Sequence, residues 1–206
     1  MCFENLSPEL QSTIVSGAIG LLGALIGALA AIGSTYLAKK LQAAGEVSLY
    51  ARIVHSKGSI NSACGCYKSG MSDGLVMRVP LWVDIINTCG ISRIIRDLSM
   101  HAYLGEEEVA TFTQIQRIGH DDDAILLGNE GAYTFVIPAN GACRFDLEYM
   151  LKETDIPGDE KQFDALIMTY FDEKNGIHKF HLMDIERCWS LGEVKTEKKW
   201  ITLTKG

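Results

Sequence analysis

Six cysteines, five histidines and a run of aspartates are the residues of this 206-residue chain that could support metal or redox chemistry. Cys64 and Cys66 stand one residue apart, so their thiols could share a metal ion. Structural zinc sites, however, need two such pairs or histidines at a matching spacing. The other four cysteines are scattered singly along the chain. We therefore expect reduced cysteines, no metal site and no cofactor.

The histidines show no ligand pattern. His178 and His181 are three residues apart, and on a strand two such side chains point to opposite faces. His120 is followed by three aspartates at 121–123, which could attract a cation. That run lacks the Asp-x-Asp-x-Asp-Gly order of a calcium loop. A solvated acidic loop is the simpler interpretation.

Three arginines, Arg78, Arg93 and Arg96, are the candidates for a ligand site. Guanidinium groups make bidentate hydrogen bonds to phosphate, so these side chains could hold an anionic ligand such as a cyclic oligonucleotide. Arg93 and Arg96 differ by three positions, so on one regular strand they face opposite ways. Ordinary surface charge is the alternative interpretation of all three.

Catalytic signatures are absent from the sequence. It contains no GxxxxGK[ST] phosphate loop, no GxSxG nucleophile elbow and no HExxH metal helix. We therefore expect no catalytic residues and a protein that is not an enzyme, with a hydrolase built from scattered residues as the alternative. The net charge of −7 argues against general nucleic-acid binding, which depends on neutralising phosphates.

The first element that must position these residues is an apolar stretch from Thr13 to Ala38. It contains no charged residue and is followed directly by Lys39 and Lys40. At about 1.5 Å per residue, a helix of this length crosses the roughly 30 Å apolar core of a bilayer. The predicted organisation is a short extracytoplasmic tail at 1–12, a transmembrane helix at 13–38, a juxtamembrane linker at 39–46 and a cytosolic domain at 47–206.

The apolar stretch also separates small from bulky residues. At about 100° per residue, the small ones fall within an arc of about 160°, with Ala18 and Gly33 as exceptions. Helices in lipid associate through such small residues, and Gly23 and Gly27 form one GxxxG step. We expect close packing against copies of the same helix, or against another protein. The packing residues are Ser16, Gly20, Gly23, Ala24, Gly27, Ala28 and Ala31. The alternative is that membrane helices are simply rich in glycine and alanine.

The charges that flank the helix predict its orientation. Only acidic residues precede it, whereas basic residues follow it, so the positive-inside rule places the N-terminus outside and the C-terminal domain in the cytoplasm, at the inner membrane. A cleaved signal peptide needs a basic n-region, which is missing, so we expect the helix to be retained. The odd number of cysteines after the helix fits a reducing cytosol.

Strand patterns dominate after residue 46. The clearest strand spans 75–87, where Val79, Leu81, Val83 and Ile85 alternate with other residues and Pro80 suggests a bulge or an edge. Asn175-Gly176 predicts a hairpin. The remaining strands are expected at 47–54, 91–104, 109–118, 133–137, 142–151, 163–171 and 177–185, with a short one at 200–203. Loops are expected at 56–74 and 119–130. About eight short strands predict a β-sandwich or barrel.

Three segments resemble a known group of proteins. LWVDIINTCGISRIIRDLSMHAYL, the turn IPANG and FDALIMTYFDEKNGIHKFHLMDI are similar to bacterial single-pass membrane proteins with a cytosolic immunoglobulin-like β-sandwich. The resemblance covers most of the chain after residue 47. It implies a binding or scaffold domain, and some proteins of comparable architecture look like antiviral-defence membrane effectors.

The expected function is therefore that of a non-enzymatic, membrane-anchored oligomeric effector. Its β-sandwich binds a ligand, for example a nucleotide second messenger, or a partner protein. Its helix assembles in the bilayer and perturbs it. The alternative is a passive membrane-anchored adaptor or accessory subunit that binds another protein through the sandwich.

Overall fold

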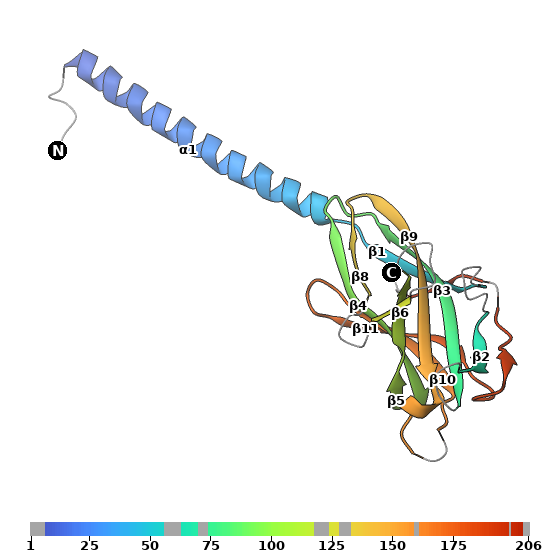
Figure 1. Cartoon of the computed structure of the whole chain (residues 1–206). Coiled ribbons are helices and arrows are strands. Elements are labelled where there is room, and N and C mark those ends of the chain that lie inside the picture. Colours follow the sequence, from blue (N-terminus) through green and yellow to red (C-terminus); the bar gives the residue numbers. More distant parts are fainter. Residues whose placement is uncertain are drawn as a thin grey trace. The chain divides into compact units, whose positions relative to one another are not determined.

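The computed structural model describes residues 7–55, 63–69, 74–117, 124–127, 133–158, 161–197 and 199–203 (Figure 1). The chain divides into two compact units, Met1–Ala44 and Gly45–Gly206. The first contains one long helix. The second is a β-domain built from two antiparallel sheets.

Helix α1 spans Pro8–Ala43 and is long and apolar enough to cross a membrane, as the sequence predicts. The helix extends beyond the predicted span at both ends, over 8–12 and 39–43. The hydroxyls of Thr13 and Thr35 donate to the carbonyls of Glu9 and Ala31, which satisfies these polar groups within the helix. None of its side chains is buried within the chain.

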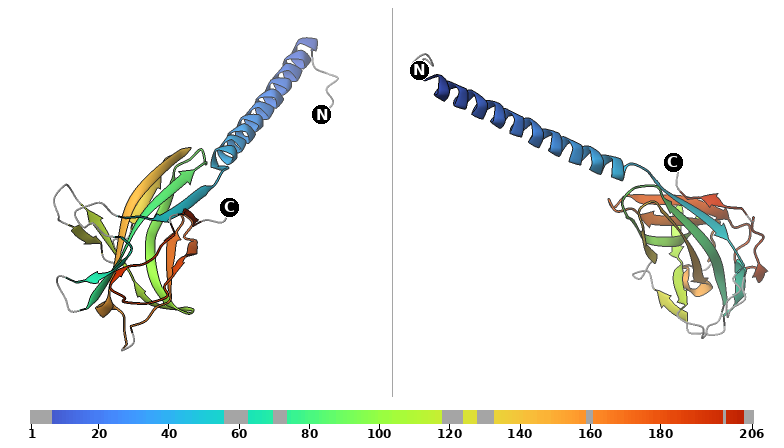
Figure 2. Two further views of the ribbon diagram at one scale, coloured as in Figure 1. Left: turned by 90° about the vertical axis from the view of Figure 1, so that its right-hand side faces the viewer. Right: turned by 90° about the horizontal axis from the view of Figure 1, so that it is seen from above.

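The larger sheet has eight described strands. Its main order is β12-β2-β3-β9-β6-β7, and β1 pairs with both β3 and β13. The bounds are β1 Val47–Ile53, β2 Gly65–Lys68, β3 Leu75–Asn87, β6 Thr113–Arg117, β7 Ala124–Leu127, β9 Gly141–Lys152, β12 Gly192–Glu193 and β13 Ile201–Thr202. The long strands β3 and β9 pair from Val76–Lys152 to Asn87–Gly141 and run side by side (Figure 2).

The smaller sheet has five described strands. Its main order is β11-β10-β4-β5, and β8 pairs with the first half of β4. The bounds are β4 Arg93–Leu104, β5 Glu107–Thr111, β8 Tyr133–Ile137, β10 Ala165–Phe171 and β11 Ile177–Asp184. The predicted hairpin is confirmed, since β10 and β11 pair across the Asn175-Gly176 turn. A 3₁₀ turn, η3, covers Glu153–Asp155.

One hydrophobic core lies between the two sheets. The alternating residues Val79, Leu81, Val83 and Ile85 of β3 are fully buried, as predicted. They belong to the same cluster as core residues of β4 and β10, such as Met100 and Met168. The two sheets therefore bury their apolar faces against one another, which is the reason that neither face needs a covering helix.

The strand pattern was incomplete in four places. The predicted strand at 109–118 is two strands, β5 and β6, which belong to different sheets and meet at the buried Phe112. The predicted loops at 56–74 and 119–130 contain β2 and β7, and β12 was not predicted. Strands of two to four residues are too short to show an alternation. The aspartates 121–123 lie outside the described residues.

Pro80 lies in the centre of a sheet rather than at an edge, and the β3–β9 pairing passes it without a bulge. On its other side, β2 pairs with residues up to Arg78 and β1 with residues from Leu81. Pro80 therefore lies where the neighbouring strand changes from β2 to β1. Its missing N–H removes no hydrogen bond of the ladder at that point.

Candidate functional site

The three predicted arginines do not form one cluster. Arg78 lies on β3, where its guanidinium contacts the buried Glu148 of β9 at 3.3 Å. Arg93 and Arg96 lie on β4 of the other sheet. The structure therefore separates Arg78 from the other two and gives it a structural ion pair.

Arg93 and Arg96 both contact the turn between β10 and β11. Arg93 forms an ion pair with Glu173, and Arg96 donates to the carbonyl of Asp172 and, at 2.9 Å, to Oδ1 of Asn175. The pairing of β4 shifts between Ile95 and Leu98, as at a β-bulge, with a left-handed Asp97 at φ 52°. Only Arg93 lines the pocket described next.

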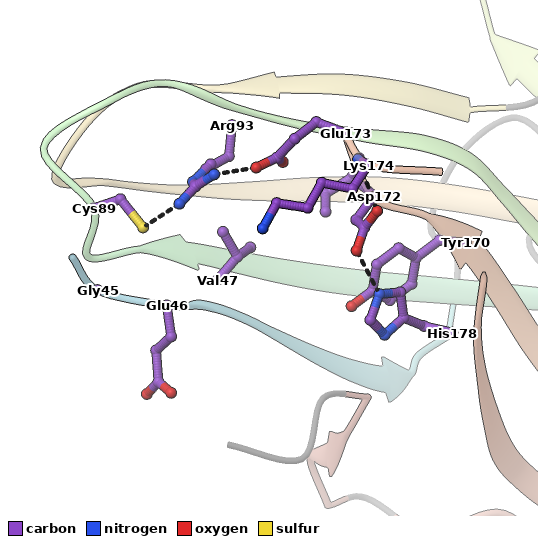
Figure 3. Close-up of a pocket in the computed structure, with 11 residues that line it drawn as sticks. Gly45, Glu46, Val47, Cys89, Arg93, Tyr170, Asp172, Glu173, Lys174 and His178 are labelled. Carbon is purple, nitrogen blue, oxygen red and sulfur yellow. Dashed lines mark hydrogen bonds and ion pairs between the residues drawn. The ribbon is translucent and has the colours of Figure 1, made fainter. Parts of the chain in front are cut away.

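A pocket of about 220 Å³ lies in the β-domain beside the turn between β10 and β11 (Figure 3). Its walls come from Gly45–Val47, from the start of β4 with Cys89, Arg93 and Ile95, and from the β10–β11 hairpin with Tyr170, Asp172, Glu173, Lys174 and His178. Sequence reasoning identified Arg93 alone. The Asn175-Gly176 signal predicted the hairpin, but nothing local indicated that its turn folds over the start of β4.

Most charges in the pocket are paired with one another. The hydrogen bond from Arg93 to the Cys89 sulfur, at 3.4 Å, and the neighbouring Glu173 carboxylate raise the pKa of the Arg93 guanidinium. Asp172 accepts from the backbone N–H groups of Lys174 and Gly176 and from Nε2 of His178, at 2.8–3.0 Å. The hydrogen bond from His178, followed by that from Gly176, lowers the pKa of Asp172.

Lys174 is the cation left for a ligand. In the described part of the chain no acidic side chain pairs with its ammonium group. Its side chain extends toward the Arg93 side of the pocket, whereas the Glu46 carboxylate points away from the other labelled groups (Figure 3). Tyr170 forms a wall, stacked on His178 at 4.6 Å, and burial raises the pKa of its hydroxyl to about 12, so it remains a neutral donor. The pocket thus offers the Lys174 ammonium group beside an aromatic ring, in a lining that also carries the carboxylates of Glu46, Asp172 and Glu173.

Asp172 should make stability depend on pH at acidic values. A carboxyl whose pKa is lowered by folding stabilises the protein above its ordinary pKa of 3.8, and this contribution is lost as the pH falls through the folded value. We expect unfolding of the full chain in detergent to become easier below about pH 4, and Asp172→Asn to flatten that dependence. Urea titrations at successive pH values measure it. Equal slopes for the two proteins would contradict the assignment.

The end of the domain that carries the pocket is held by Asn87. This side chain is buried, and its Nδ2 donates to the carbonyls of Ile91 and Pro138, both at 2.9 Å, and of Ile137 at 3.4 Å. Its Oδ1 accepts from the N–H of Cys89 at 2.9 Å. One amide therefore joins the β3–β4 turn to the β8–β9 turn.

The first residues of the β-domain, Gly45 and Glu46, contact the β3–β4 turn at Thr88. The N–H of Glu46 donates to Oγ1 of Thr88 at 2.9 Å, and the N–H of Thr88 donates to the carbonyl of Glu46 at 3.0 Å. Gly45 has φ +125°, and a Cβ there would lie 2.7 Å from the Thr88 oxygen. Only glycine fits this backbone.

The five cysteines within the described residues give no sign of a reactive or metal-binding site. Burial raises the pKa of Cys64 to about 12 and that of Cys66 to about 11, so both are protonated thiols at neutral pH. Over the described ranges no group of three or more His, Cys, Asp or Glu side chains could hold a metal ion. His178 and His181 each contact their own aspartate, Asp172 and Asp184.

His101 lies in a hydrogen-bond network with Glu108, Thr111 and Thr169. Its Nδ1 lies 2.8 Å from Glu108, and its Nε2 lies 2.8 Å from Oγ1 of Thr169. This is the order of contacts in a Ser-His-Asp triad. Thr169, however, is 9% exposed and lies within β10, which is paired on both sides. A substrate has little access to that hydroxyl, so the network is better understood as structural.

The predicted packing face of α1 has open space at its glycines among the described residues. A Cβ placed on Gly20, Gly23 or Gly27 would meet nothing within 4 Å. The face is therefore available to another helix.

No protein-family model matches the sequence, and no curated protein is significantly similar to it, so the chain's own residues carry the functional conclusion.

Proposed function

We propose that this protein is a non-enzymatic, membrane-anchored effector that self-associates through α1 and binds a small anionic ligand through its β-domain. The observation that carries the proposal is the glycine-rich face of α1, exposed along an apolar helix long enough to span a bilayer. In lipid such a face gains energy only by packing against another helix. Copies of the same helix are the simplest partners.

The pocket supports the ligand-binding half of the proposal. A phosphate or carboxylate suits the Lys174 ammonium group, which has no ion pair among the described residues, together with the Arg93 guanidinium and the neutral Tyr170 hydroxyl. A volume of about 220 Å³ lies below the range of about 300–1,000 Å³ for drug-sized ligands. A single anionic group fits, and a nucleotide second messenger would be only partly enclosed.

Two finer points belong to the same proposal. The two antiparallel sheets around one core support an immunoglobulin-like sandwich, with the additional short strands at its edges. The lysines that follow the span support a cytoplasmic β-domain at the inner membrane. A passive adaptor with the same anchor is the second candidate, and it requires no assembly of the helices.

Replacing Gly23 or Gly27 with leucine tests the helix face. We expect either change to remove crosslinked oligomers of the full chain in membranes, because a leucine separates the backbones by more than close packing allows. Ala18→Leu is the matched control, since Ala18 lies among the bulky residues and should leave the oligomers intact. The readouts are crosslinking and, in expressing bacteria, toxicity with loss of membrane potential.

The outcomes separate the two candidates. Loss of oligomers and of toxicity in the glycine variants alone supports the effector. Unchanged oligomers in Gly23→Leu and Gly27→Leu would refute packing through this face. Oligomers without any toxicity would favour the adaptor.

A further inference from the structure

Exposed apolar side chains gather at one end of the β-domain. Ile91, Ile94, Val136 and Ile177 are 38–67% exposed. Ile94 and Val136 are direct cross-strand partners. Ile91 lies in the β3–β4 turn, where its carbonyl accepts a hydrogen bond from Asn87. Ile177 is the first residue of β11 and directly follows the β10–β11 turn that lines the pocket. We call these four residues the apolar end. Clustered exposed apolar residues on a soluble face mark contacts with proteins or membranes.

The chain enters the β-domain at this same end. Val47, Asn87 and Gly141 align in register there, and Gly45–Glu46 are hydrogen-bonded to Thr88. Gly45 follows Ala43, the last residue of α1, by two positions. Gly45 follows Lys39 by six positions, and even a fully extended chain spans only about 20 Å over that length. If α1 crosses a bilayer, this end cannot move far from its surface.

Positive charge accompanies the apolar end. Lys174 has no acidic partner among the described residues, whereas Arg93 in the same pocket is paired with Glu173, and Glu46 and Asp172 also line it. Lys39 and Lys40 lie on the short connection between the span and the domain. Apolar side chains combined with lysines suit the interface of an anionic membrane, where each cation near the surface contributes about 1 kcal/mol.

We propose that the apolar end docks onto the lipid headgroup layer, with Ile94 and Val136 at the acyl boundary and Lys174 beside a lipid phosphate. This inference rests on the proposed membrane span. It identifies a lipid headgroup as the source of the anionic group that the pocket binds. Docking keeps the ligand-binding turn at the membrane surface. It also covers apolar area that the domain otherwise leaves in water.

Site-specific photo-crosslinking tests the docking. p-Benzoylphenylalanine replaces Val136, Leu191 or Ile26, one at a time, in the full chain in nanodiscs of phosphatidylethanolamine and phosphatidylglycerol. Leu191 is the matched control because it is 63% exposed, against 67% for Val136, and lies beside β12, away from the apolar end. We expect lipid adducts by mass spectrometry at Ile26 and Val136, and severalfold fewer at Leu191. A probe at Ile94 should repeat the result for Val136.

The probe at Ile26 separates failure of this inference from failure of the proposed function. Lipid adducts at Ile26 with equal labelling at Val136 and Leu191 would overturn the docking and leave the span intact. No lipid adduct at Ile26 would overturn the span and the docking with it. Adducts at Val136 with a second copy of the chain instead of lipid would overturn the lipid source and make the apolar end a protein interface.

Discussion

Replacing Asn87 with leucine is expected to lower the free energy of unfolding by about 3–4 kcal/mol. Leucine has a similar volume but leaves the carbonyls of Ile91, Ile137 and Pro138 and the N–H of Cys89 without their partner. Burying such groups unpaired costs far more than a hydrogen bond gains. Urea unfolding of the full chain in detergent, followed by tryptophan fluorescence, measures the change.

Gln114→Met is the matched control for that experiment. Gln114 is also a fully buried amide, but its Oε1 has no hydrogen-bond partner among the described residues and its Nε2 makes one long contact of 3.3 Å to Ser99. Its replacement should change stability by less than about 1 kcal/mol. A loss at Asn87 no larger than that at Gln114 would show that the two turns hold together without the Asn87 amide.

Gly45→Ala is expected to cost about 3–5 kcal/mol in the same assay. Two effects combine at this position. A φ of +125° is strained for any residue with a Cβ, and the added Cβ would meet backbone atoms of Thr88 and Cys89 at 2.7–2.8 Å. Because backbone atoms cannot rotate away, the entry segment must move off the β3–β4 turn. The change should therefore also weaken binding of the proposed anionic ligand in the adjoining pocket.

Gly192→Ala separates these two effects. Gly192 has φ +118°, close to that of Gly45, but a Cβ there meets nothing within 4 Å. Its replacement should cost only the backbone strain, about 1–2 kcal/mol. Similar losses at the two glycines would mean that the contact of Gly45 with Thr88 and Cys89 contributes nothing to stability.

The elements that could be predicted are those whose signal lies in neighbouring residues of the sequence. The apolar run at 13–38 lies within α1, and the alternation at 75–87 defines β3 at both ends, because burial on one face imposes a period of two. The strand predicted at 109–118 failed for the converse reason. Only Phe112 lies between β5 and β6, so no turn residues mark the point where the chain leaves one sheet for the other.

The candidate site was predicted only in part. Arg93 was identified by its chemistry, since a guanidinium suits an anion wherever it lies. Its ion-pair partner could not be found from sequence, because Glu173 lies in the β10–β11 turn, 80 residues further along the chain. Cys89, by contrast, is only four residues away from Arg93. Arg78 has the same chemistry, yet its ion pair with Glu148 removes it from the site.

The sequence by itself therefore determined the apolar helix, its separation of small from bulky residues and the β character of the domain. These follow from the composition and period of neighbouring residues, which are local properties. Only the tertiary structure decided which arginine lines a pocket, which glycine admits no side chain, and where the exposed isoleucines and Val136 gather. Each of these depends on contacts between residues far apart in the chain, and such contacts leave no periodic trace in the sequence.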